Sequence, residues 1–182
     1  MSEASYIANL NSAIAYLKMG QRDHARESLN RALSQVPQDE KKGDNLAYIK
    51  MLSFQAAIAV GDKDYTTAAK YIEEGLSKRE NYADLLYLRL VVLRHRGAYN
   101  AMFPDVLKYL LACSAEDSST YDYGFTSDEL VAMVMNEMLP LAYENSADHE
   151  AYMAAVTTFI NATSSKLLKI AQEIMLAIDK TH

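Results

Sequence analysis

The chain has 182 residues, of which half are hydrophobic and about a quarter are charged, a composition typical of a globular protein with a core of its own. Glycine and proline are scarce, with 6 and 3 copies, which disfavours all-β folds because these need many turns. The formal net charge of −6 argues against general nucleic-acid binding, and no apolar run reaches the roughly 18 residues of a membrane span.

The chain carries no recognisable catalytic motif, so we expect that it is not an enzyme. Phosphate-binding glycine loops are absent, and the four histidines have no metal-ligand spacing, so we expect no cofactor and no metal. The single cysteine, Cys113, permits no disulfide within the sequence and is expected to be buried in a helix. The N-terminus lacks the pattern of a signal peptide, and a cytoplasmic location is therefore expected.

Residues 5–37 are predicted to form two helices joined by a tight turn. Gly20 ends the first helix, as glycine commonly does, and Pro37 stops the second. The apolar residues of each helix recur at the spacing of one helical face, and the alanines among them let the helices approach closely. The first face consists of Ile7, Leu10, Ala13, Ile14 and Leu17, and the second of Ala25, Leu29, Ala32 and Leu33.

A second helix pair is predicted over residues 46–80. Gly61 is expected to open its turn, and Ala68, Ile72 and Gly75 repeat the small–large–small pattern of the first pair. The polar stretch before it is interpreted as an extended linker or a lengthened helix start.

A third pair is predicted over residues 82–114, with its turn at Gly97. Met102 stands 34 residues after Ala68, and Val106 and Leu110 continue its face. Pro104 is expected to begin the second helix of this pair, at or near that residue, because proline is tolerated in a first turn.

These three pairs resemble the tetratricopeptide repeat, a unit of 34 residues. Ala13 and Tyr16 match its first helix, and the second helix matches at Ala25, Leu29, Ala32 and Pro37. The resemblance implies an all-α fold over residues 1–114, in which antiparallel helix pairs stack as a short right-handed α-solenoid. It also implies a concave groove that holds a peptide or helix of a partner protein.

The groove is expected on the first helix of each pair. Its candidate residues are Leu10, Ile14, Leu17, Ser53, Ala57, Val60, Tyr87, Val91 and Arg94. Tyr87 and Arg94 are the strongest candidates, since these residue types are enriched at interface hot spots. The family's clamp for C-terminal carboxylates would fall on Leu10, Ile14, Phe54, Asp84 and Leu88, which have the wrong chemistry, so an apolar guest segment is expected.

Residues 115–182 are predicted to form an acidic loop and three helices that pack on the stack. Thr126 and Glu129 are interpreted as a capping box that starts the first of them, and Pro140 is expected to kink or end it. Residues 109–165 hold nine acids and no Lys or Arg, and this acidic stretch could dock on a basic surface or remain a solvated face. The apolar last helix either folds into the core or associates with a second copy through Ile170, Ile174 and Ile178.

Three functions remain open at this point. The first is a non-catalytic adaptor that binds a protein partner, without nucleic acid or membrane. The second is a small acidic secretion chaperone that shields an apolar client segment, which the repeat class also includes. The third is a subunit, catalytic or not, of an enzyme complex.

Overall fold

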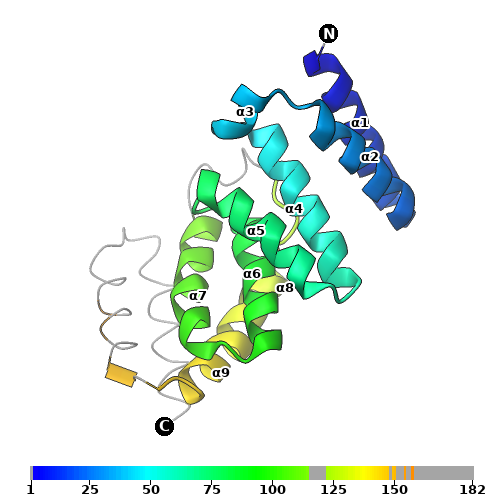
Figure 1. Cartoon of the computed structure of the whole chain (residues 1–182). Helices are drawn as coiled ribbons and strands as arrows, with labels where there is room; N and C mark the ends of the chain where they lie inside the picture. Colours follow the sequence, from blue (N-terminus) through cyan, green and yellow to red (C-terminus); the bar gives the residue numbers. More distant parts are fainter. Residues whose placement is uncertain (1, 115–121, 148, 151–153, 155–156, 158–182) are drawn as a thin grey trace. The chain divides into compact units, whose positions relative to one another are not determined.

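The computed structural model describes residues 2–114, 122–147, 149–150, 154 and 157 (Figure 1). Throughout this part the regular structure is helical and contains no strand, and neighbouring helices pack in pairs. The all-α prediction is thereby confirmed, and the pairing is consistent with a helical-repeat architecture. The helices divide into two compact units, unit 1 up to Glu80 and unit 2 from Asn81 onward.

Unit 1 consists of two helix hairpins joined by a short helix. Helices α1 (Ser2–Lys18) and α2 (Arg22–Gln35) lie antiparallel to each other, as do α4 (Leu46–Gly61) and α5 (Tyr65–Lys78) (Figure 1). The polar stretch between the hairpins is not a lengthened helix start, because it forms a separate helix, α3 (Gln38–Lys42). Asn45 then caps α4 by accepting a hydrogen bond from the backbone of Tyr48 at 3.1 Å.

Unit 2 contains the third hairpin, α6 (Ala83–Arg96) and α7 (Tyr99–Ser114), and a further helical segment. That segment runs through α8 (Asp128–Met133), the π-helical turn η2 (Val134–Met138) and α9 (Leu139–Glu144). The predicted boundary lies at residue 114, whereas the compact units divide after Glu80. The reason is that α7 packs against η2 and α9, which ties the third hairpin to the segment that follows it.

The three hairpins share one buried register on their second helices. Ala25, Ala68 and Met102 are equivalent in the predicted alignment and are all fully buried. The residues four positions later, Leu29, Ile72 and Val106, are buried as well, and all belong to the core of their own unit. This repetition follows from one small or flexible side chain per turn where two helices approach closely.

The three hairpin turns also share one geometry, and this corrects the expectation for Gly61. Each turn contains a left-handed residue, Gly20 with φ 71°, Lys63 with φ 61° and Gly97 with φ 66°. The residue after each one donates to the carbonyl five positions earlier, as in a Schellman motif. Gly61 is the last residue of α4, and a Cβ there would lie 3.4 Å from the guanidinium of Arg22, which packs on it.

Both prolines of unit 2 lie inside helical structure, which corrects two further predictions. Helix α7 begins at Tyr99, so Pro104 lies in its interior and does not start it. Pro140 follows η2, whose wider turn lets the helical segment continue into α9 without ending at the proline. The cap of α8 is Ser127, which accepts a hydrogen bond from Leu130 at 3.3 Å, and not the predicted Thr126.

Candidate functional site

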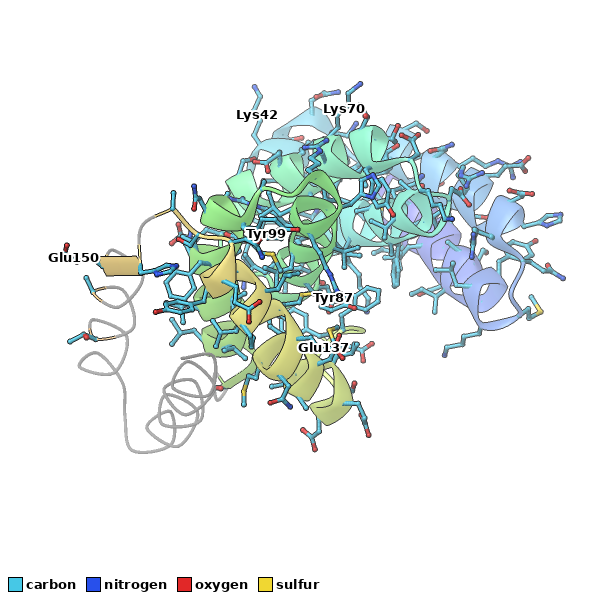
Figure 2. All side chains as sticks on the ribbon, turned by 90° about the horizontal axis from the view of Figure 1, so that it is seen from below. Lys42, Lys70, Tyr87, Tyr99, Glu137 and Glu150 are labelled. Atoms are coloured by element: carbon cyan, nitrogen blue, oxygen red, sulfur yellow. The ribbon has the colours of Figure 1, made fainter. Side chains whose placement is uncertain are left out.

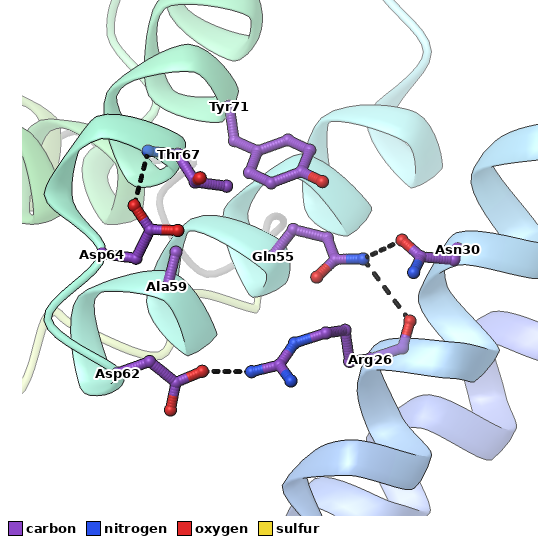
Figure 3. A pocket seen from close by; sticks show the side chains of 8 residues that line it. All are labelled: Arg26, Asn30, Gln55, Ala59, Asp62, Asp64, Thr67 and Tyr71. Carbon is purple, nitrogen blue, oxygen red and sulfur yellow. Dashed lines mark hydrogen bonds and ion pairs between the residues drawn. The ribbon is translucent and has the colours of Figure 1, made fainter.

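A polar pocket of about 330 Å³ lies in unit 1 between helices α2, α4 and α5 (Figure 3). All of its lining residues except one alanine carry a polar group. They are Arg26, Asn30, Gln55, Ala59, Asp62, Asp64, Thr67 and Tyr71. The sequence analysis did not identify this pocket, because its residues are spread over three helices and the turn between two of them.

Gln55 forms the floor of the pocket and is only 3% exposed. Its carboxamide nitrogen donates to Oδ1 of Asn30 at 2.7 Å and to the backbone oxygen of Arg26 at 3.5 Å (Figure 3). A buried polar side chain needs such partners, so this pair joins α4 to α2. Gln55 stands within a helix of mostly apolar residues, and that contrast is the one sequence signal that could have revealed it.

The charged groups of the pocket are paired or engaged in capping. Asp62 forms ion pairs with Arg26 and, at 2.9 Å, with Arg22. Asp64 caps α5 by accepting a hydrogen bond from the backbone of Thr67 at 3.1 Å, and the bonds to Thr67 hold the pKa of Asp64 below its usual value. The pocket therefore presents donors and acceptors together without an excess of positive charge.

The predicted groove residues of the first two hairpins mostly belong to the core of unit 1. Leu10 and Ser53 are buried, and Ile14 and Leu17 are half-buried and pack against the core cluster. Ala57 and Val60 are half-buried on α4. The predicted residues are absent from the lining of the polar pocket, which uses the neighbouring face of α4.

On α6 the predicted residues Tyr87 and Val91 are half-buried, and Arg94 is exposed. The ring of Tyr87, labelled in Figure 2, stacks on Phe125 with centroids 5.1 Å apart and planes at 14°. It also tilts against Tyr109 at 5.9 Å. Burial raises the pKa of Tyr87, with the charge of Arg94 acting in the opposite direction. The aromatic candidate for partner binding is therefore already covered by the chain's own polypeptide.

The covering stretch is Tyr123–Gly124–Phe125, which is not helical and which we call the self-segment. Asp84, 7% exposed, accepts from the backbone nitrogens of Gly124 and Phe125, with both distances 2.8 Å. Tyr109 donates its hydroxyl to the carbonyl of Phe125 at 2.6 Å. The alternation of aromatic residues around Gly124 is the sequence signal for this contact, although the composition of the stretch predicts only a polar loop.

Tyr82 contributes a further aromatic contact, because its ring meets that of Tyr123 edge-on at 5.0 Å. Residues Asp84, Tyr82, Tyr87 and Tyr109 thus hold the main chain and both rings of the self-segment, and we call these four residues the clamp.

The thiol of Cys113 lies next to the clamp but is not a nucleophile at neutral pH. Burial raises its pKa to about 11, the charge of Asp84 adds to this effect, and a hydrogen bond with Tyr109 opposes it. Burial also raises the pKa of the Tyr109 hydroxyl, so that group remains a donor to Phe125. Because a thiol reacts as its thiolate, this environment suits a packing role for Cys113.

Several predictions fall outside the described residues, namely the last two helices and the self-association residues Ile170, Ile174 and Ile178. Among the residues that are described, no three His, Cys, Asp or Glu side chains are grouped so that they could hold a metal ion. Over the same part of the chain, no helix combines the length and the apolar character needed to cross a bilayer. Comparison of the chain with protein-family models, curated proteins and solved structures finds no match.

Proposed function

We propose that the protein is a non-catalytic interaction module that binds an extended peptide or a helix of a partner protein. The observation that carries this proposal is the polar pocket of unit 1, in which three helices converge on the amide pair Gln55–Asn30. A peptide main chain alternates donors and acceptors, and the pocket lining offers groups complementary to both.

The size and polarity of the pocket support a peptide over a small metabolite. Pockets for small molecules typically measure about 300–1,000 Å³ and are mostly apolar with a few polar groups. The pocket of unit 1, at about 330 Å³, lies at the lower end of that range and has an almost entirely polar lining. One or two side chains of a partner, with the adjoining main chain, would fill it.

The electrostatics of the pocket support a partner segment of little net charge. Asp62 neutralises Arg26, so a phosphate or carboxylate would meet no unpaired guanidinium there. Asp64 adds a negative group at the rim. Because the whole chain contains one cysteine and an ordinary globular surface charge, we place this function in a reducing compartment such as the cytoplasm.

A pair of matched double variants tests the proposal. Asn30→Ala/Thr67→Ala removes two polar groups from the pocket lining, at one exposed and one half-buried position. Arg31→Ala/Lys70→Ala changes exposed residues on the same two helices outside the pocket lining, and Lys70 points away from the ribbon in Figure 2. Proteins retained from a lysate of the source cells by each tagged chain are identified, and the best candidate is then purified and titrated.

The expected result is a partner whose affinity falls at least about tenfold with the pocket variant and is unchanged with the control variant, a tenfold loss corresponding to about 1.4 kcal/mol. Equal affinity for both variants would place binding elsewhere on the chain. Turnover of a substrate that only the pocket variant abolishes would replace the proposal with an enzymatic function.

A further inference from the structure

The self-segment is held in the manner of a bound peptide. Successive backbone nitrogens, those of Gly124 and Phe125, donate to the two oxygens of one carboxylate, that of Asp84. The carbonyl of Phe125 accepts from Tyr109, so the main chain is bound through donors and through an acceptor. The partner groups are about forty residues away in sequence for Asp84 and sixteen for Tyr109, so this is a tertiary site and not a local turn.

The clamp also defines which side chains fit. The rings of Tyr123 and Phe125 each meet a tyrosine ring of α6 or of its cap, while Gly124 lies between them against the carboxylate. A Cβ at position 124 would stand 3.7 Å from Oδ2 of Asp84, an ordinary contact, and its φ is not in the left-handed region. The clamp therefore accepts aromatic–small–aromatic segments, with alanine as well as glycine at the centre.

We propose that the clamp is a second peptide-binding site, and that the self-segment occupies it until an aromatic–small–aromatic segment of a partner protein takes its place. Such an internal ligand lowers the apparent affinity for the partner by the fraction of time in which the clamp is free. Because the tethered segment has a high effective concentration, weakening it should sharpen binding in trans. The site lies in unit 2 and is independent of the polar pocket of unit 1, so either can fail without the other.

The test uses the full chain and a fluorescent peptide with the sequence of residues 122–127, Asp-Tyr-Gly-Phe-Thr-Ser, measured by fluorescence anisotropy. The variant Tyr123→Ser/Phe125→Ser weakens the self-segment, and its helix content is checked by circular dichroism. We expect this variant to bind the peptide at least about tenfold more tightly than the wild type. A peptide with proline in place of the central glycine lacks one of the two donors to Asp84 and should not bind.

Adding Asp84→Asn to the weakened chain provides the matched control on the protein side. The asparagine is isosteric but offers one acceptor oxygen where two backbone nitrogens need one each, so binding should be lost. The proposal is overturned if the folded, weakened variant does not bind the peptide, or if it binds equally well with and without the Asp84→Asn substitution. It is also overturned if the wild-type chain forms dimers in which the self-segment of one copy occupies the clamp of the other.

A measurement on the unmodified chain keeps the proposal testable if the variant does not fold. Amide hydrogen exchange of Gly124 and Phe125 should be at least about 100-fold faster than that of the buried amides of α6, and should accelerate further when excess peptide is added. Exchange of these two amides at the rate of the α6 core would show that the segment leaves only on global unfolding, which contradicts the proposal.

Discussion

At the residue scale, Cys113 and Tyr109 lie one helical turn apart on α7 and show how burial controls reactivity. The pKa of the Cys113 thiol rises from 9.0 to about 11, chiefly because burial disfavours the thiolate. The sequence analysis expected a buried helix residue, and the structure places the side chain at intermediate exposure within α7.

The first prediction concerns the alkylation of this cysteine, the only one in the chain. At pH 8 a pKa higher by two units reduces the thiolate fraction about 100-fold, since each unit is a factor of ten. Iodoacetamide should therefore react about 100-fold more slowly with the folded protein than with the urea-unfolded chain. The rate should rise with pH toward a midpoint near 11, and equal rates in the folded and unfolded chains would contradict this environment.

Lys63 is a second residue whose position is explained only by the fold. It takes the left-handed conformation that Gly20 and Gly97 take in the other two hairpins, at a cost of roughly 1–2 kcal/mol for a residue with a Cβ. Its spacing of 34 residues from Gly97 repeats the spacing of Ala68 from Met102. That regularity could have located the turn residue, but the presence of Gly61 directed attention two positions upstream.

The second prediction is that Lys63→Gly stabilises the protein by about 1 kcal/mol, because glycine adopts positive φ without strain. Lys63 is exposed, so few packing contacts are lost. Urea unfolding followed by circular dichroism measures the change in the unfolding free energy. Lys63→Ala, which keeps the Cβ, serves as the control and should give no comparable gain.

At the element scale, the prolines show how a helix accommodates a residue that should interrupt it. Pro104 has no N–H to donate to the carbonyl of Asn100, yet α7 continues through it because its flanking residues Met102, Phe103 and Val106 are buried. Pro140 instead follows a π-helical turn, in which the nitrogen of Leu139 donates to the carbonyl of Val134. Tertiary packing thus overrides the local preference in both helices.

The third prediction is that Pro104→Ala stabilises unit 2. Pro104 is exposed, so alanine fits and restores one backbone hydrogen bond. Proline in a helix interior costs about 3 kcal/mol relative to alanine, and up to about 1 kcal/mol of this is offset through the unfolded chain. We expect a gain of about 1–2 kcal/mol in thermal unfolding, a smaller gain for Pro104→Gly, and no gain only if α7 requires the proline for its packing.

A buried ion pair links α6 to α7. Nε of Arg89 lies 2.7 Å from Oδ2 of Asp105, and Asp105 is 1% exposed. Taking two charges from water is costly, so such a pair contributes little net stability, but removing one partner leaves a buried charge without its counterpart.

The fourth prediction is that Arg89→Ala destabilises the protein by about 3 kcal/mol. Arg96→Ala, an exposed arginine on the same helix, is the matched control and should change stability by less than about 0.5 kcal/mol. Chemical unfolding of both variants measures the difference. A loss below about 1 kcal/mol for Arg89→Ala would show that other groups compensate the charge of Asp105.

At the scale of the whole molecule, the chain consists of two compact units, each with a core of its own. The core of unit 1 draws on both of its hairpins, with Leu29 fully buried at its centre. In unit 2 the third hairpin and the segment from α8 to α9 bury one another, including Tyr109 and Val134. The division follows these packing partners and not the repeat boundaries.

The fifth prediction is that residues 1–80 fold alone. A fragment of this length with a contiguous core should unfold cooperatively, with a stability of a few kcal/mol. Circular dichroism during heating should show one transition, and Leu29→Ala should destabilise the fragment by about 2–5 kcal/mol. A fragment without helical structure would show that unit 1 depends on the rest of the chain.

The sequence by itself determined the helices and their pairing, because the apolar period of a helix is a local property written in neighbouring residues. Ala25, Ala68 and Met102 were aligned from spacing alone, and all three are buried. The tertiary structure alone decided how Asp84 meets Gly124 and how Gln55 meets Asn30, since these partners lie tens of residues apart. A hydrogen bond between distant residues leaves no periodic trace in the sequence, and both candidate binding sites consist of such bonds.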